Sequence, residues 1–490
     1  MPAMGGAGEL TGFVNRVSRF LRGPATTCAP SATVADVASR MPPGGGGVVV
    51  VDADGAPVGI VTDRDLRSKV VAVRRPPGAT LAADVMSAPV VTIAPGALAF
   101  EALLEMTRRE IHHLVVVDGG RLVGLLASDD VLMTQAVHPV TLAREIGRAP
   151  SRAALARLAA DVTTLVQRLV DDGGRAGDVA RVVAELNDRI VARLLDQVEA
   201  ALRELGESPP MPYCWLVFGS EARREQTLRT DQDNGLVYAD PSPDLAEAAA
   251  RYFARLAETA IAGLVEVGFP PCPGGAMASN PRWCQPLATW TGYFREWMAR
   301  PTPEHVLAAS MYFDLRPVVG DSALGESLAA LVRSEAPGQR RFLTVMAGDV
   351  VDRRLPVGPL GGIRTPRSGP HRGALDLKGA GGIQLVGAGR VHALELGLAD
   401  TGTAARFRGA GERGLYPLAE VTEIVDAYED LLRLRLVHQL ASLRAGRPPD
   451  NLVPLSGLSH RDGVLLRECL RTVARVQGGL RERFATDYAG

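Results

Sequence analysis

Two aspartates separated by a single residue carry the clearest chemical signal in this sequence. Asp231 and Asp233 lie in the segment TDQDN, directly before the apolar run of residues 235–238. Residues at positions i and i+2 of a strand point to the same face, so both carboxylates can bind hard divalent cations through oxygen. Such cations can activate an attacking hydroxyl and stabilise a leaving pyrophosphate. We therefore predict that Asp231 and Asp233 are catalytic and bind Mg2+ or Mn2+.

A glycine and a serine upstream of this pair indicate where phosphate would bind. Gly219 and Ser220 follow the apolar run 213–218 and precede a predicted helix. Backbone amides and a hydroxyl at a helix start favour an anion, because the positive end of the helix dipole lies there. We predict that Gly219 and Ser220 bind phosphate. Arg223 either positions phosphates or caps and solvates the helix, and both interpretations stay open.

A third carboxylate is expected from a neighbouring strand. Asp314, at the end of the apolar run in AASMYFDLRPVVGD, is the best candidate, and we predict that it binds metal with the other two aspartates. Arg316 would lie on the same strand face and could neutralise phosphate charge. The order strand, tight turn, helix, strand and later carboxylate argues against a merely solvated acidic loop, since aspartate is depleted inside strands.

The elements around this constellation begin with an internal repeat between residues 24 and 137. Each copy is predicted as helix, strand, turn, strand, helix, with β-branched runs at 48–51 and 114–117. The strand pairs are joined by turns at Asp54-Gly55 and Gly119-Gly120. A short helical segment, residues 1–23, precedes the repeat.

The repeat resembles a tandem pair of CBS domains, a module that binds adenosine nucleotides between its copies. In that family a threonine and an aspartate three residues later contact the ligand, and Thr62 and Asp65 match them in GIVTDRDL. In the second copy Asp130 keeps its place but Ala127 replaces the threonine, so one cleft is expected to lack this contact. The resemblance implies an adenosine-nucleotide ligand and a homodimer formed through the pair. A dimerisation or spacer module without a ligand is the alternative.

Two further regions have helical periodicity. Residues 138–208 are predicted as a helical linker, with apolar residues at three- and four-residue spacing broken by glycines at 173, 174 and 177. Residues 336–490 are predicted as a helical domain, with amphipathic runs at 425–443 and 465–484. Asp376 and Lys378 in this domain are interpreted as a structural salt pair rather than as part of the site, because buried charges usually occur paired.

Composition excludes several classes of protein. A chain of 490 residues is too long for one core, and its formal net charge of −1 without basic clusters argues against nucleic-acid binding. Five scattered cysteines without a CxxC pair argue against a disulfide framework or a zinc site. No apolar stretch reaches the about 18–20 residues of a membrane helix, and no leader is recognisable. We expect a cytoplasmic protein with no membrane contact.

The segments GSEARREQ and TDQDN resemble the nucleotidyltransferase domain of bacterial PII-protein uridylyltransferases. They are more similar still to a nucleotidyltransferase family that commonly follows a CBS pair and whose pattern reads GSEGRGEQ and TDQDN. Ala222 and Arg224 stand where glycines are usual in that pattern. The resemblance continues in CPGGAMASNPRWCQPLATW, FDLRPVVGD and LDLKGAGGIQLVGAGRVHAL. It implies an NTP substrate, ATP or UTP, and a hydroxyl acceptor such as a tyrosine of a PII-like protein.

These observations predict a multidomain α/β protein with a DNA-polymerase-β-type nucleotidyltransferase domain. We expect nucleotidyl transfer regulated by adenosine nucleotide at the CBS pair. The alternative is a non-catalytic nucleotide-sensing interaction protein. The expected domains are an N-terminal segment (1–23), the CBS pair (24–137), a helical linker (138–208), the nucleotidyltransferase domain (209–335) and a C-terminal helical domain (336–490).

Overall fold

A computed structural model describes residues 15–21, 23–42, 46–131, 139–228, 231–358 and 362–486. The chain forms two compact units, one of residues 1–144 with 171–174 and one of residues 145–170 with 175–490. None of the helices in these described ranges combines the length and the apolar character needed to span a bilayer.

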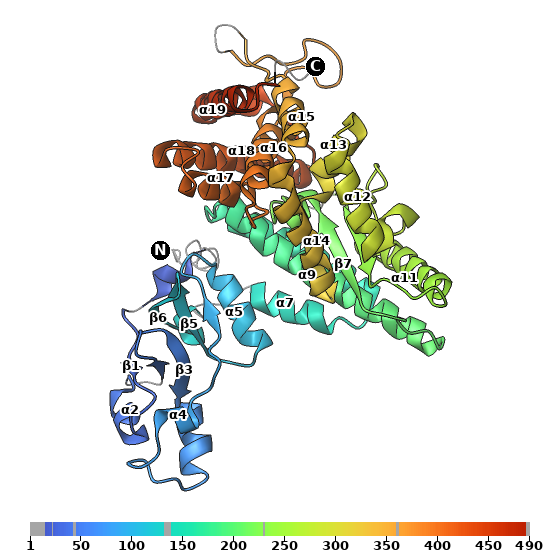
Figure 1. The fold of residues 1–490 in the computed structure, drawn as a ribbon. Helices are drawn as coiled ribbons and strands as arrows, with labels where there is room; N and C mark the ends of the chain where they lie inside the picture. Colours follow the sequence, from blue (N-terminus) through green and yellow to red (C-terminus); the bar gives the residue numbers. More distant parts are fainter. Residues whose placement is uncertain are drawn as a thin grey trace. The chain divides into compact units, whose positions relative to one another are not determined.

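The first unit contains two three-stranded sheets with the same order, β1-β2-β3 and β4-β5-β6 (Figure 1). In each sheet the first pairing is parallel and the second is an antiparallel hairpin. This confirms the predicted repeat. The elements are β1 (Thr27–Cys28), α2 (Val34–Arg40), β2 (Gly47–Val51), β3 (Pro57–Thr62), α3 (Asp63–Asp65), η2 (Leu66–Val71), α4 (Ala82–Val85), β4 (Thr92–Ile93), α5 (Ala99–Arg108), β5 (His113–Asp118), β6 (Arg121–Ala127) and α6 (Ser128–Val131).

The two hairpin turns of the repeat lie where the sequence predicts them. Gly119 and Gly120 both have positive φ, 52° and 83°, and they connect the paired residues Asp118 and Arg121. A two-residue hairpin loop of this kind requires positive φ at both central positions, which glycine adopts without strain. In the first copy Gly55 has φ 82° and the Asp52 side chain accepts the Asp54 amide.

The predicted N-terminal helical segment falls partly outside the described residues, which begin at residue 15. The described part forms a single helical turn, η1 (Val17–Phe20), and it packs on the second copy of the repeat. The Val17 amide donates to the Ala97 carbonyl at 2.8 Å, and the Val17 side chain is fully buried.

The second unit contains a four-stranded mixed sheet of order β10-β7-β8-β9. The central strand β7 is buried along its whole length, which explains its uninterrupted apolar sequence YCWLVF. It pairs antiparallel with β10 and with β8, and β8 pairs parallel with β9. The predicted order of strand, turn, helix and strand is confirmed. The elements are β7 (Tyr213–Phe218), α10 (Gly219–Ala222), β8 (Asn234–Tyr238), β9 (Cys284–Pro286) and β10 (Leu315–Gly320).

Helices surround this sheet in the second unit (Figure 1), whereas residues 139–144 belong to the first unit. The linker helix α9 packs on α11, β10 and α18, and α15, α16, α18 and α19 pack together as the C-terminal domain. The further elements are α7 (Pro139–Arg148), α8 (Arg152–Asp171), α9 (Ala176–Glu204), α11 (Ala246–Val267), α12 (Leu287–Ala299), α13 (Pro303–Tyr312), α14 (Ser322–Glu335), α15 (Arg340–Asp352), β11 (Ala374–Asp376), α16 (Ile383–Leu396), α17 (Thr403–Glu412), α18 (Leu418–Arg444), β12 (Leu452–Pro454) and α19 (His460–Phe484).

Candidate functional site

The turn after β7 places Gly219 and Ser220 in the wall of a cavity of about 230 Å3 within the second unit. Gly219 has φ 56°, a conformation that glycine adopts without strain. Its amide donates to the Asp314 carbonyl at 3.0 Å and is therefore already occupied. The expectation that the Gly219 amide faces phosphate is wrong in this respect, whereas Ser220 lies at the cavity.

The TDQDN segment is anchored by the two amide side chains that alternate with its aspartates. Gln232 Nε2 donates to the Phe269 carbonyl at 3.1 Å, and Asn234 Oδ1 accepts the Ala278 amide at 2.9 Å. Both amide side chains are buried. This alternation leaves Asp231 and Asp233 to share the other side, immediately before β8 begins at Asn234.

Asp231 and Asp233 do lie together, and a cysteine joins them. One ligand atom from each aspartate and the sulfur of Cys272 lie within 4.8 Å of one another. A parallel bridge between Gln232 and Pro271 brings Cys272 beside the aspartates. The arrangement of the carboxylates agrees with the spacing argument, and Cys272 was missed by it.

A second observation, independent of the sequence spacing of the aspartates, indicates that the Asp233 carboxylate can bind a divalent cation. Its Oδ1 atom is buried and has no hydrogen-bond partner among the described residues. Burial raises the pKa of Asp233 to about 6; Asp231 adds to this rise, while the Cys272 hydrogen bond, Lys378 and Arg223 oppose it. A bound cation would supply the missing partner and favour the ionised carboxylate.

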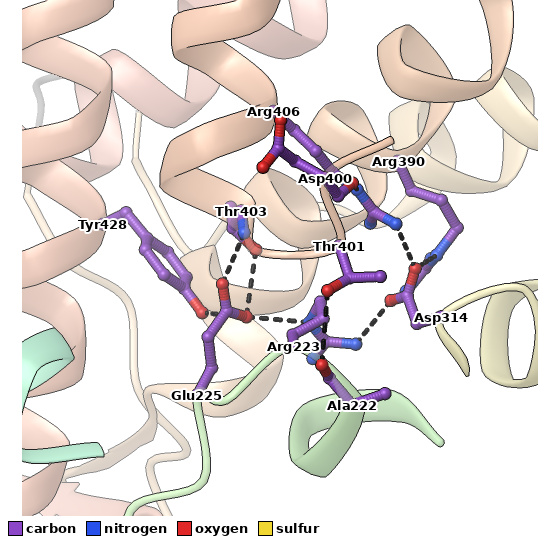
Figure 2. A network of polar contacts seen from close by, with 10 residues as sticks. All are labelled: Ala222, Arg223, Glu225, Asp314, Arg390, Asp400, Thr401, Thr403, Arg406 and Tyr428. Carbon is purple, nitrogen blue, oxygen red and sulfur yellow. Dashed lines mark hydrogen bonds and ion pairs between the residues drawn. The ribbon is translucent and has the colours of Figure 1, made fainter. Parts of the chain in front are cut away.

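Asp314 does not join this group, and its predicted role as a metal ligand is not supported. Its side chain is fully buried, and three arginines surround its carboxylate (Figure 2). Asp314 Oδ2 lies 2.6 Å from Arg223 Nη1 and 2.7 Å from Arg390 Nη2. Asp314 Oδ1 lies 2.6 Å from Arg406 Nη2.

The charges around Asp314 explain why a cation would not bind there. Burial alone would raise its pKa, but Arg390, Arg406 and Arg223 outweigh burial and hold the pKa of Asp314 well below its usual range. Both carboxylate oxygens are occupied by guanidinium groups, and an added divalent cation would be repelled by three positive charges. The carboxylate therefore holds arginines rather than metal.

Arg223 is bound by carboxylates on both sides. Its Nε donates to Glu225 Oε2 at 2.8 Å, in addition to the Asp314 contact. Glu225 also accepts bonds from Thr403 and from the Tyr428 hydroxyl, the latter at 2.7 Å (Figure 2). The loop after α10 is thus tied to α17 and α18 of the C-terminal domain.

The two departures from the glycine pattern have different environments. Arg224 has φ 56°, the left-handed region in which glycine is unstrained, and this explains why a glycine suits that position. Ala222 is fully buried, and its φ is not in the positive region. Its carbonyl accepts a bond from the Thr401 hydroxyl at 3.3 Å.

We expected Arg316 to neutralise phosphate charge, but its side chain is bound elsewhere. Its guanidinium forms a two-pronged ion pair with Asp188 of α9, with distances of 2.7 and 2.9 Å. Its Nη2 also donates to the Glu221 carbonyl at 3.2 Å. Arg316 therefore attaches the predicted linker helix to strand β10.

The cavity next to Asp233 lies between the sheet domain and the C-terminal helices. Its lining contains five basic and three acidic side chains, so its charge favours an anion. Lys378 is one of these basic residues, and no ion pair with Asp376 is present in the described ranges. Asp376 Oδ1 instead accepts the amides of Lys378 and Gly379 at 3.0 and 3.2 Å. The interpretation of a salt pair is wrong.

Sequence reasoning missed the contribution of the C-terminal domain to this cavity. Arg390, Lys378 and Arg435 all come from that domain and line the cavity. Arg390 and Lys378 lie in LDLKGAGGIQLVGAGRVHAL, a segment that resembles the nucleotidyltransferase family and could have indicated their role. Arg435 lies within an amphipathic helix, and no local pattern marks it.

The residues predicted to bind a ligand in the repeat pair line one cavity of about 820 Å3 in the first unit. Thr62 Oγ1 and the Thr62 amide donate to Asp65 Oδ2 at 2.6 and 2.9 Å, and Lys69 Nζ lies 2.7 Å from Asp65 Oδ1. Asp130 accepts the amide of Ala127 at 3.0 Å. The corresponding positions of both copies thus face one cavity.

Several known proteins are similar to parts of the chain. "Uncharacterized protein MK0525" of Methanopyrus kandleri is 33% identical over 132 residues, which cover 26% of this chain and 67% of that protein. Inosine-5'-monophosphate dehydrogenase of Mycobacterium tuberculosis is 36% identical over 210 residues, and the chain spans only 36% of its length. A CBS domain protein from Pyrobaculum aerophilum, solved in complex with AMP, is 28% identical, with a TM-score of 0.23, and covers 25% of this chain and 95% of its own.

Family-level matches cover most of the described chain. Residues 17–72 and 82–136 match the CBS domain. Residues 160–304 match the family described as "Putative nucleotidyltransferase DUF294". Residues 340–484 match the "Putative nucleotidyltransferase substrate binding domain" of the same family. With both of that family's domains in sequence order behind a CBS pair, the chain belongs to the DUF294 nucleotidyltransferase family.

Proposed function

We propose that this chain transfers a nucleoside monophosphate from ATP or UTP to a hydroxyl acceptor. The observation that carries the proposal is the juxtaposition of Asp231 and Asp233, with a buried oxygen on Asp233 that has no partner among the described residues, at a cavity lined by more basic than acidic side chains. In this reaction the acceptor oxygen forms a bond to the α-phosphorus, the bond to the β-phosphate oxygen breaks, and pyrophosphate leaves. The hydroxyl proton is released to solvent.

Asp231 and Asp233 would hold Mg2+ or Mn2+, and the third carboxylate expected at Asp314 is not needed for that. The cation, when bound, would stabilise charge on the phosphates and lower the pKa of the attacking hydroxyl. Gln232 and Asn234 keep the two carboxylates on one side of the chain by their buried hydrogen bonds. Ser220 at the cavity wall would contact phosphate through its hydroxyl.

The resemblance to PII uridylyltransferases points to a tyrosine of a small regulatory protein as the acceptor. The cavity at Thr62, Asp65 and Asp130 supports binding of an adenosine nucleotide that adjusts the transfer rate, with Lys69 as an added cationic contact. We propose that the CBS pair also forms a homodimer.

The test is to incubate the full chain with ATP or UTP labelled at the α-phosphate, Mg2+ or Mn2+, and candidate acceptors that include a PII-like protein. We expect label on the acceptor and release of pyrophosphate. Asp231→Asn/Asp233→Asn is the inactive variant, because amides bind divalent cations far more weakly than carboxylates.

Asp240→Asn is the matched control, since Asp240 lies beyond the other end of β8 and caps the Ala288 amide. The control should keep its activity, because an asparagine oxygen can still accept that amide. Pyrophosphate release that persists in the double variant would overturn the site assignment. Nucleotide binding by the wild type without transfer to any acceptor would favour a non-catalytic sensor.

A further inference from the structure

The cavity beside Asp233 contains two basic side chains that contact no carboxylate among the described residues. We propose that Arg435 and Lys378, both from the C-terminal domain, form the subsite for the polyphosphate chain of the nucleoside triphosphate. This inference rests on the proposed function, because it assigns part of the same site.

Arg435 is the more informative of the two residues. It belongs to α18 and is partly buried in the cavity wall, and this burial lowers its pKa. Its Nε donates to Asn451 Oδ1 at 2.6 Å, a neutral acceptor. No carboxylate pairs with it in the part of the chain that the structure describes. A partly buried guanidinium without a counter-ion is costly, and an anionic ligand would remove that cost.

Two carboxylates, Asp376 and Glu225, raise the pKa of Arg435 from a distance, but both already form hydrogen bonds with other groups. Glu225 binds Arg223, Thr403 and the Tyr428 hydroxyl. Asp376 accepts two backbone amides next to Lys378. Neither carboxylate can turn toward Arg435 without breaking these bonds.

Lys378 stands at the cavity with its side chain exposed and unpaired in the described ranges. Lys378 and Asp233 line the same cavity, and the charge of Lys378 opposes the rise of the Asp233 pKa. The Asn451 carbonyl accepts the amide of Leu377 at 3.0 Å, while the Asn451 side chain binds Arg435. Asn451 therefore contacts Arg435 and the residue that precedes Lys378.

The chain contains only two lysines against 52 arginines, and both lysines line a cavity. Lys69 lies in the CBS cavity, and Lys378 lies in the cavity beside Asp233. Lysine differs from arginine in offering a compact, mobile charge that can follow a phosphate group.

The other three basic residues of the cavity differ in that each of them contacts a carboxylate. Arg223 and Arg390 are paired with Asp314, and Arg353 is paired with Asp349 at 2.9 Å. Arg435 and Lys378 thus provide the basic side chains of this cavity that contact no carboxylate in the described part of the chain, and a polyphosphate would supply the missing anion. Arg353 offers a control at the same cavity with its charge already satisfied.

The experiment titrates the full chain with inorganic tripolyphosphate in magnesium buffer, using calorimetry. Arg435→Met and Lys378→Met should each weaken binding roughly tenfold or more, as expected for loss of a charge-assisted hydrogen bond. Arg353→Met should change the affinity for tripolyphosphate less than about twofold, since Arg353 already pairs with Asp349 at a partly exposed position where charges interact weakly. Lys378→Arg, which keeps the positive charge but not the compact ammonium group, should lose less affinity than Lys378→Met. Any binding at the CBS cavity should be the same in all variants.

Affinities of Arg435→Met and Lys378→Met that match the affinity of Arg353→Met would overturn the subsite. If Arg435→Met unfolds, Lys378→Met still decides, because the lysine side chain is exposed. The proposed function fails separately, by absence of transfer in the wild type, and tripolyphosphate binding does not depend on that result. Transfer without a change in tripolyphosphate affinity would refute the subsite and leave the function intact.

Discussion

Asp314 and Arg390 form a buried ion pair, with Asp314 Oδ2 2.7 Å from Arg390 Nη2, that joins the start of strand β10 to helix α16. Arg223 and Arg406 bind the same carboxylate, so one aspartate holds three arginines from three elements together (Figure 2). The residue that we predicted from the sequence to bind metal therefore connects the nucleotidyltransferase domain to the C-terminal helical domain.

Asp314→Asn should destabilise the second unit. Loss of the negative charge would leave three buried guanidinium groups facing one another, and breaking a buried ion pair typically costs about 3–5 kcal/mol. Urea unfolding measures the loss. Asp321→Asn, at the exposed other end of β10, should behave like wild type because an amide can still cap the Ala323 amide. A variant with unchanged stability and lost cation binding would instead restore Asp314 as a metal ligand.

Cys272→Ser should change which metals bind beside Asp231 and Asp233. Thiolate ligands favour softer divalent cations such as Co2+, Zn2+ and Cd2+ over Mg2+. Wild-type protein loaded with Co2+ should show a thiolate-to-metal absorption band in the near ultraviolet, and the variant should lose that band while keeping Mg2+ binding. Cys284→Ser, at a buried cysteine in β9, should retain it. A band that survives in Cys272→Ser would exclude the sulfur from the site.

Glu221→Gln should flatten the dependence of stability on pH. Burial, together with Asp188, raises the pKa of Glu221 from 4.5 to about 8, although Arg316 opposes the shift. Between those pH values the unfolded chain has lost a proton that the folded chain retains, so rising pH lowers the free energy of unfolding. At pH 8 the free energy of unfolding of the variant should therefore be higher than that of wild type by on the order of a few kcal/mol. This difference should vanish below about pH 4.5.

Denaturant unfolding at pH 4.5, 6 and 8 tests this directly. Glu326→Gln, at an exposed glutamate of α14, should leave the pH profile of wild type unchanged. If the free energy of unfolding changes with pH equally in Glu221→Gln and wild type, the pKa of Glu221 is not raised.

Arg224→Gly should be more stable than Arg224→Ala by about 1 kcal/mol, because only glycine adopts positive φ without a steric penalty. Both variants remove the arginine charge, so their difference isolates the backbone contribution. Thermal unfolding of the two variants measures that difference. Equal stabilities would show that the left-handed conformation at residue 224 is relaxed in the alanine variant.

Asp65→Asn should weaken AMP binding to the CBS cavity roughly tenfold, because the amide loses the ion pair with Lys69 and accepts a ribose hydroxyl less strongly than a carboxylate. Asp84→Asn, at an exposed aspartate of α4 outside this cavity, is the control. Equilibrium dialysis with labelled AMP measures both. An affinity that is the same in the two variants would remove Asp65 from the ligand site.

Local sequence determined the elements and the carboxylate pair. The repeat, strands β7 and β8, the turn at Gly219 and the i, i+2 placement of Asp231 and Asp233 depend on hydrophobic periodicity and backbone geometry over a few residues. Such short-range rules do not depend on what packs against the segment. The proximity of the two carboxylates was therefore predicted from the sequence, and so was the helical character of α18 and α19.

Tertiary structure alone decided which charges meet. Asp314 satisfied every local expectation for a third metal ligand, but residues 76 and 92 positions later, Arg390 and Arg406, occupy its carboxylate. Lys378, Arg435 and Cys272 reach the site from segments far from it in the chain. Electrostatic interaction depends on distance in space and on burial, and neither quantity is encoded in a local window of sequence.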